Sequence, residues 1–129
     1  MNKPTLKEQA HGEIEKIFRI LLPQNGLSVR EEQITLCHAM LDTLLKNNIA
    51  LCDAGVGIGK TYAYLTACIL LKKFAPHGPA GSQPVVISTS SVALHRRIYP
   101  IPIPDFSGEP CYLQTHPGNR KKRKRAFCL

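Results

Sequence analysis

The sequence predicts an α/β fold in which helices flank a parallel β-sheet. Short apolar runs of strand length at residues 49–52 and 85–89 alternate with segments whose apolar residues recur at helical spacing. The first run is continuously apolar, which is typical of a strand buried on both faces, as in parallel sheets. The 129 residues, 43% hydrophobic and 20% charged, are enough for one modest core and at most one domain.

The first predicted helix begins at a capping box, in which the Thr5 and Glu8 side chains can each satisfy a backbone N–H of the other residue. The apolar residues that follow at helical spacing are Ile14, Ile17, Phe18 and Leu21. The pattern ends at Pro23, and residues 24–26, Gln-Asn-Gly, predict a turn. Residues 1–26 are therefore expected to form an N-terminal helical segment.

A second capping box, from Ser28 to Glu31, predicts a second helix that ends at about Lys46. The apolar run at residues 49–52 follows it as the first predicted strand. After a glycine-rich turn, apolar residues at helical spacing predict a third helix over about residues 60–74.

The next segment is a predicted loop, because residues 75–84 contain three prolines and two glycines. Residues 85–89 form the second predicted strand. A short helix capped by Ser90 or Ser91 would then run to Ile98.

Residues 99–129 form a tail that is first proline-rich and then basic, with Cys111–Leu113 as a candidate third strand. Six of the net +8 charges lie in residues 120–125, so the basic character belongs to the tail rather than to the fold. Such a run is either a nucleic-acid-binding patch or a segment without function.

Cysteine content and hydropathy exclude several classes of protein. The five cysteines are an odd number without a CxxC pair, which favours reduced thiols over a disulfide framework or a metal site. The sequence contains no run of 18 apolar residues, so it predicts no membrane span. The N-terminus lacks the apolar stretch of a secretory signal, so we expect a cytoplasmic protein.

The sharpest functional motif is the glycine-rich stretch at residues 54–61, Ala-Gly-Val-Gly-Ile-Gly-Lys-Thr. Its second half matches the end of a phosphate-binding loop, and Ala54 stands where the first glycine usually is. A strand before the loop and a helix after it are the setting that this motif requires. The alternative is a glycine-rich turn that happens to precede a helix, a chance match in roughly one such chain in a hundred.

The motif assigns a chemical task to each part of the loop. Its three glycines permit backbone angles closed to other residues and leave room for a phosphate. The amides of residues 57–61 can point at phosphate oxygens, helped by the N-terminus of the following helix. Lys60 would meet the β- and γ-phosphates, and the Thr61 hydroxyl would bind Mg²⁺.

Two stretches resemble the beginning of DinG-type helicases, the bacterial relatives of XPD within helicase superfamily 2. They are residues 27–33, Leu-Ser-Val-Arg-Glu-Glu-Gln, and residues 52–65, Cys-Asp-Ala-Gly-Val-Gly-Ile-Gly-Lys-Thr-Tyr-Ala-Tyr-Leu. Alanine at the first loop position is typical of that family. Asp53 replaces the usual glutamate, and Val56 and Ile58 replace two usual threonines, at positions where the phosphate contacts are made by the backbone.

The resemblance implies that residues 27–98 are the start of a RecA-like motor domain that binds ATP and Mg²⁺. The residues that it places around the nucleotide are Arg30, Gln33, Ala54, Gly55, Gly57, Ile58, Gly59, Lys60 and Thr61. Gln33 would hydrogen-bond the adenine edge, and Arg30 would help to form the adjoining surface. Without the resemblance, both could be solvated residues on the first turns of a helix.

Residues 86–94 are similar to the family's motif Ia, which grips the nucleic-acid backbone and implies single-stranded DNA as a partner. The candidate contacts are Ser88, Thr89, Ser90, Ser91, Arg96 and Arg97. Hydroxyls, guanidinium groups and helix N-terminal amides suit contacts with phosphate. A plain helix cap after a strand is the alternative interpretation.

The resemblance implies ATP binding within an ATP-dependent DNA helicase, with Lys60 and Thr61 as catalytic residues. The family's DEAH-type acidic box and second motor domain have no counterpart here, so we expect a fragment that is inactive without the rest of the helicase polypeptide. Only Cys111 and Cys128 could serve an iron–sulfur cluster that needs four cysteines, so no complete cluster is expected. The alternatives are another P-loop ATPase, of AAA or DNA-loading type, and a non-catalytic nucleotide- or nucleic-acid-binding module.

Overall fold

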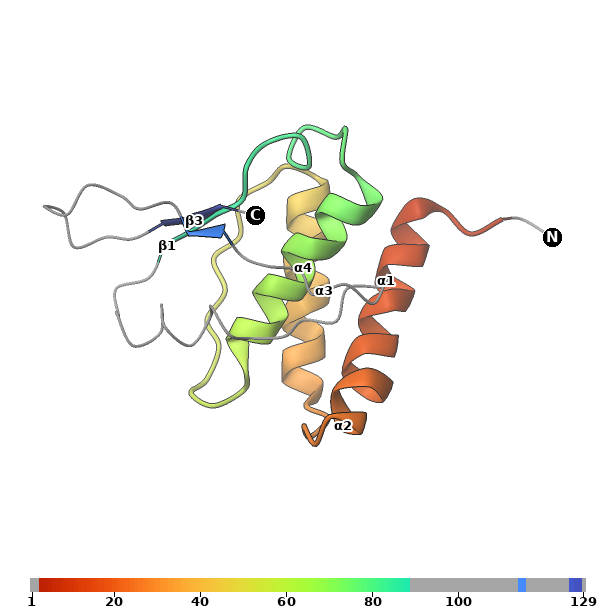
Figure 1. Ribbon diagram of the computed structural model, residues 1–129, viewed down its shortest axis with the longest axis vertical. Coiled ribbons are helices and arrows are strands. Elements are labelled where there is room, and N and C mark those ends of the chain that lie inside the picture. Colours follow the sequence, from red (N-terminus) through yellow and green to blue (C-terminus); the bar gives the residue numbers. More distant parts are fainter. Residues whose placement is uncertain (1–2, 89–113, 116–125, 129) are drawn as a thin grey trace, which may run out of the picture. The chain divides into compact units, whose positions relative to one another are not determined.

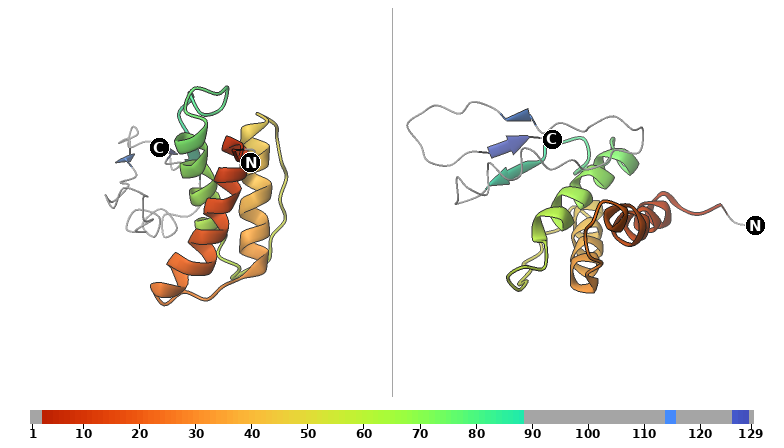
Figure 2. Two further views of the ribbon diagram at one scale, coloured as in Figure 1. Left: turned by 90° about the vertical axis from the view of Figure 1, so that its right-hand side faces the viewer. Right: turned by 60° about the horizontal axis from the view of Figure 1, so that its bottom comes forward.

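The computed structural model of the protein describes residues 3–88, 114–115 and 126–128. The chain divides into two compact units, Met1–Gln83 and Pro84–Leu129. The first unit is helical and consists of α1 (Leu6–Lys16), the π-helical turn η1 (Ile17–Leu21), α2 (Leu22–Gln24), α3 (Glu31–Leu45) and α4 (Lys60–Phe74). Helices α1, α3 and α4 pack side by side (Figures 1 and 2).

The second unit contains the described strands, β1 (Val86–Ser88), β2 (Gln114–Thr115) and β3 (Ala126–Cys128). They form a sheet in the order β1-β3-β2, and both pairings are antiparallel. Ile87 of β1 and Thr115 of β2 both lie opposite Phe127 of β3. The strand predicted at residues 85–89 is thus observed over its central part, whereas the helix expected from Ser90 or Ser91 lies outside the described residues.

The predicted parallel α/β fold is wrong, and with it the expected RecA-like domain. Within the described part of the chain the strands pair only in antiparallel fashion, and the helical unit contains no strand. Residues 49–52, the first predicted strand, form irregular chain between α3 and the glycine-rich loop, with Ile49 and Leu51 fully exposed. An apolar run becomes a strand only when another strand satisfies its backbone groups, and no described strand pairs with this one.

The first helix begins at the predicted capping box. The Glu8 N–H donates to Thr5 Oγ1 at 3.2 Å, and the Thr5 N–H donates to the Glu8 carboxylate at 2.7 Å. The helical rod then passes through the π turn η1 and the short helix α2 and ends at Gln24, within one residue of its predicted end at Pro23; the predicted turn follows at residues 25–26. In a continuous α-helix the proline ring would meet the carbonyl of Arg19, and we attribute the wider turn to the relief of this contact.

Helix α4 has the predicted bounds, residues 60–74, and α3 ends within one residue of its predicted end. The capping box expected from Ser28 is wrong, because Arg30 is the residue that precedes α3 and no side chain caps this helix. The backbone of Arg30 is extended, with φ −134° and ψ 112°. This conformation turns the chain into α3 and leaves the Arg30 side chain available for another contact.

The core of the helical unit lies between α1, α3 and α4. Its largest fully buried side chains are Phe18, Ile14, Leu41, Leu65, Leu70, Leu71, Thr66 and Cys37. Cys37 and Cys68 are buried free thiols, whereas Cys52 is exposed. Burial raises the pKa of Cys37 to about 12 and that of Cys68 to about 11, so both stay protonated at neutral pH and behave as small apolar side chains.

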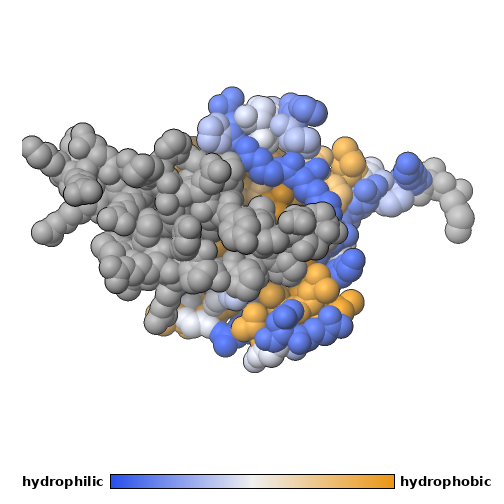
Figure 3. All heavy atoms as spheres, in the orientation of Figure 1, coloured by the Kyte–Doolittle hydropathy of each residue, from blue (hydrophilic) through white to orange (hydrophobic). Residues whose placement is uncertain are grey.

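The surface of the helical unit mixes hydrophilic and hydrophobic residues, which stand beside one another in Figure 3. Ile20, Leu27 and Val29 are among the exposed hydrophobic side chains. Within the described part of the chain, no helix combines the length and the apolar character that crossing a membrane requires.

Candidate phosphate-binding loop

The glycine-rich stretch at residues 54–61 forms a loop that leads directly into α4. Gly57 and Gly59 have left-handed backbone conformations, with φ of 85° and 84°, and Gly59 is the N-cap of α4. Glycine adopts this conformation without the steric cost that a Cβ atom imposes. The positions of these glycines therefore set the path by which the loop turns into the helix.

Two side chains from the start of α3 hold the loop at these same glycines. The Arg30 guanidinium donates a hydrogen bond to the carbonyl of Gly57, and Gln33 Nε2 donates to the carbonyl of Gly59 at 2.7 Å. Gln33 is only 5% exposed, although it is polar. A buried amide needs such a partner, so this bond stabilises both the amide and the loop conformation.

The structure thus brings Arg30 and Gln33 next to the loop. Their contacts with loop carbonyls were not predictable from the sequence, because Arg30 and Gln33 lie 27 and 26 residues from their acceptors and meet them only through the packing of α3 on α4. The resemblance suggested a nucleotide-facing role for both residues and no role toward the loop itself.

Lys60 lies over the first part of the loop. Its Nζ donates to the carbonyls of Ala54 at 2.6 Å and Gly55 at 3.0 Å, and the residue is exposed. The structure therefore brings Ala54, Gly55 and Lys60 together through contacts of the lysine with the loop backbone. An ammonium group held by two neutral carbonyls in water can exchange them for a charged acceptor, because hydrogen bonds to anions are stronger.

The backbone N–H groups of the loop can donate hydrogen bonds to an anion. Among the described residues, none receives a hydrogen bond from the backbone N–H groups of residues 55–61. The first turn of α4 carries no acidic residue, and its last turn carries Lys72 and Lys73. The N-terminal end of α4 therefore presents unpaired donors and the positive end of a helix dipole, with no carboxylate in its first turn.

The other predicted loop residues lie at the same place. Ile58 and Thr61 are half-buried, and Thr61 is the second residue of α4. Thr61 would be the protein ligand of Mg²⁺, with phosphate oxygens and water as the remaining ligands. Within the described ranges, no three His, Cys, Asp or Glu side chains are grouped as they would be in a metal site made by protein alone.

The candidate DNA contacts are not brought to a described site. Ser88 is the last residue of β1 and is exposed. Thr89, Ser90, Ser91, Arg96 and Arg97 lie outside the described residues, as does the basic run at residues 120–125.

A cavity that the sequence did not predict lies between α3, α4 and residues 50–52. Its volume is about 490 Å³, and its lining includes Met40, Leu44, Tyr64 and Cys68. No residue of the loop at 54–61 lines it. It is therefore distinct from the candidate phosphate site.

Neither a family model nor a solved structure matches the chain. Over 102 residues it is 28% identical to the 3'-5' exonuclease DinG of Staphylococcus aureus, with the same values for strains USA300, NCTC 8325 and N315. The chain is similar to DinG proteins. This similarity agrees with the resemblance seen in the motifs and extends over 79% of the chain, although it covers only 10% of each DinG relative. The chain thus spans about a tenth of the length of the curated relatives that it matches.

Proposed function

We propose that the chain binds ATP with Mg²⁺ through residues 54–61, as the nucleotide-binding part of an ATP-dependent DNA helicase. The proposal rests on the conformation of the loop. Its backbone amides have no hydrogen-bond acceptor among the described residues, and its two left-handed glycines are hydrogen-bonded to side chains of Arg30 and Gln33. Lys60 lies at its end. Backbone donors at a helix N-terminus form an anion site whose geometry needs little rearrangement when phosphate binds.

Each side chain then has a specific task. Lys60 leaves the carbonyls of Ala54 and Gly55 and binds the β- and γ-phosphates, while Thr61 binds Mg²⁺. The Gln33 amide nitrogen is already bonded to Gly59, whereas no described residue donates a hydrogen bond to its carbonyl oxygen. That oxygen is the atom that would accept a hydrogen bond from the adenine amino group.

The DNA-related part of the proposal rests on the similarity to DinG. Single-stranded DNA is the proposed partner, contacted by Ser88, Thr89, Ser90, Ser91, Arg96 and Arg97. Coupling of ATP hydrolysis to movement along that strand would need the rest of a longer polypeptide.

Calorimetric titration tests the nucleotide part of the proposal. The full chain would be titrated with ATP, GTP and inorganic tripolyphosphate, each with Mg²⁺. Binding of all three, with ATP preferred, is the expected result, because the loop recognises phosphates and Gln33 recognises adenine. A chain that binds none of the three would rule out the nucleotide-binding proposal.

We expect Gln33→Ala to weaken binding of all three ligands about fivefold, since the net worth of the lost bond to Gly59 is about 1 kcal/mol. The preference for ATP over GTP should also disappear. Glu32→Ala is the matched control, because Glu32 is an exposed neighbour on the same helix. Unchanged affinity for tripolyphosphate would show that Gln33 does not hold the loop, and an unchanged nucleotide preference would show that it does not read adenine.

For single-stranded DNA, we expect binding to depend steeply on salt because of the basic run at residues 120–125. Neutralising six phosphates would give a slope of roughly −4 in a plot of log affinity against log salt concentration. Fluorescence anisotropy with a labelled oligonucleotide measures this slope. Deletion of residues 120–125 should flatten it, whereas a slope that survives the deletion would assign the contacts to residues 88–97 instead.

A further inference from the structure

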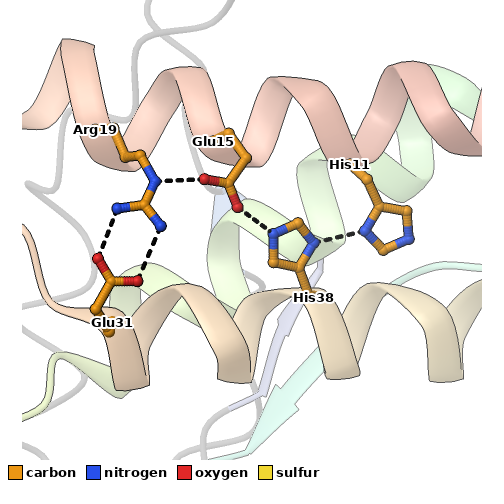
Figure 4. A network of polar contacts seen from close by, with 5 residues as sticks. All are labelled: His11, Glu15, Arg19, Glu31 and His38. Atoms are coloured by element: carbon orange, nitrogen blue, oxygen red, sulfur yellow. Dashed lines mark hydrogen bonds and ion pairs between the residues drawn. The ribbon is translucent and has the colours of Figure 1, made fainter.

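A row of polar side chains bridges α1 and α3 on the surface of the helical unit (Figure 4). His11 and His38 stand at its centre with their ring planes nearly parallel, 12° apart, and their ring centroids 4.9 Å apart. Figure 4 shows the two rings side by side, with the nitrogen edge of one facing that of the other. Their Nδ1 atoms are 2.6 Å apart. This is hydrogen-bonding distance, so one of the two nitrogens carries a hydrogen and the other accepts it.

The outer ring nitrogens each face a carboxylate. His11 Nε2 lies 2.9 Å from Asp42 Oδ1, and His38 Nε2 lies 2.7 Å from Glu15 Oε1. The pKa of Asp42 is lowered, mainly by its bond to Lys7, and that of Glu15 is lowered by its bonds to Arg19 and His38. Both carboxylates are thus ionised at neutral pH and only accept hydrogen bonds, so both Nε2 atoms carry a hydrogen.

Counting hydrogens fixes the charge of the pair. The two Nε2–H groups and one hydrogen between the Nδ1 atoms make three hydrogens on four ring nitrogens, one more than two neutral imidazoles carry. With two hydrogens, the Nδ1 lone pairs would face each other. With four, two N–H groups would collide at 2.6 Å.

We propose that His11 and His38 form a proton-binding site between α1 and α3, in which one extra proton is shared by the two Nδ1 atoms. The ligand is a single proton, and the site does not depend on the proposed nucleotide binding.

The charges of the neighbouring groups agree with one positive charge on the pair. From α1 the row contains Lys7, Glu15 and Arg19, and from α3 it contains Asp42 and Glu31. The order along the row is Lys7, Asp42, the histidine pair, Glu15, Arg19 and Glu31. Signs alternate along this row and the total charge is zero only when the pair carries +1. Helix α4, which also packs on α1 and α3, contributes no described side chain to it.

The shared proton makes the packing of α1 on α3 depend on pH. Histidines in an unfolded chain lose their protons near pH 6.5. Above that pH the unfolded pair holds fewer than one extra proton, so folding takes up a proton and stability falls as the pH rises. Below it the unfolded pair holds more than one, so folding releases a proton and stability falls as the pH drops. The contribution of the pair is therefore greatest near pH 6.5.

Nuclear magnetic resonance of the full chain with ¹⁵N-labelled histidine counts these hydrogens directly. At pH 6.5 we expect both Nε2 atoms of the pair to be protonated and both Nδ1 signals to lie between the protonated and unprotonated positions. The exposed His77 gives reference signals in the same spectrum. His77→Gln is the matched control and should leave the pair unchanged.

Two results would overturn the proposal. One is a total of two or four ring hydrogens on the pair at pH 6.5. The other is a spectrum that changes when EDTA is added, because a metal ion would then occupy the place of the proton. The unmodified chain decides both, so the test does not require a histidine variant to fold.

Discussion

Gly59→Ala is expected to lower the free energy of unfolding of the helical unit by about 2–5 kcal/mol. Gly59 has φ 84°, and a Cβ atom there would overlap the Nε2 and press on the Cδ of Gln33. The left-handed backbone costs an alanine about 1–2 kcal/mol. Displacement of the Gln33 side chain then breaks its bond to the Gly59 carbonyl and leaves a buried amide unpaired, which costs about 1–3 kcal/mol. Urea denaturation followed by circular dichroism measures the change.

Two neighbouring glycines provide graded controls. Gly57 is also left-handed, with φ 85°, but an added Cβ would meet nothing, so Gly57→Ala should cost only the backbone strain of about 1–2 kcal/mol. Gly55→Ala should be nearly neutral, because its Cβ would make only an ordinary contact with Ile58. Equal effects of the Gly59 and Gly57 substitutions would contradict a structural role for the Gln33 contact.

Lys60→Ala is expected to weaken ATP binding at least tenfold, or about 1.4 kcal/mol, because the variant loses the cation that meets the β- and γ-phosphates. Stability should change little, since Lys60 is exposed and its two bonds are to loop carbonyls. Calorimetry with ATP and Mg²⁺ gives the ratio of affinities. Lys16→Ala, which removes an exposed lysine from the last turn of α1, controls for the loss of general positive charge. Equal affinities of the wild type and Lys60→Ala for ATP would show that the loop does not bind the nucleotide.

Local features of the fold were readable from the sequence. The Thr5–Glu8 capping box and the bounds of α4 depend on a few adjacent residues and on helical spacing, and both are found in the structure. Pro23 likewise marks the end of the first helical rod to within one residue, whereas nothing in the sequence pattern predicted the π turn before it.

Features that depend on distant partners were not readable. The apolar run at residues 49–52 has the composition of a buried strand, yet a strand exists only beside another strand, and the sequence does not say which segments meet. The predicted parallel sheet depended on this run being a strand, so it was wrong for the same reason. The His11–His38 pair is a second example, because the His11/Glu15 and His38/Asp42 spacings are visible but their meeting depends on the packing of α1 on α3.

The candidate site was partly readable for the same reason. The residues of the loop itself form a contiguous motif, so Gly57, Gly59 and Lys60 could be singled out from the sequence alone. The link to Arg30 and Gln33 came from the family resemblance. Their attachment to the loop carbonyls required the structure, since it depends on how α3 lies against the start of α4.

The nucleotide-binding proposal requires the backbone amides of the loop to bind the phosphates of ATP. The most direct test is a titration of the ¹⁵N-labelled full chain with ATP and Mg²⁺, followed residue by residue through backbone amide signals. We expect the largest shifts at residues 55–61 and at the side-chain amide of Gln33, and we expect tripolyphosphate to reproduce the loop shifts. Shifts confined to other parts of the chain, or none at saturating ATP, would contradict the proposal.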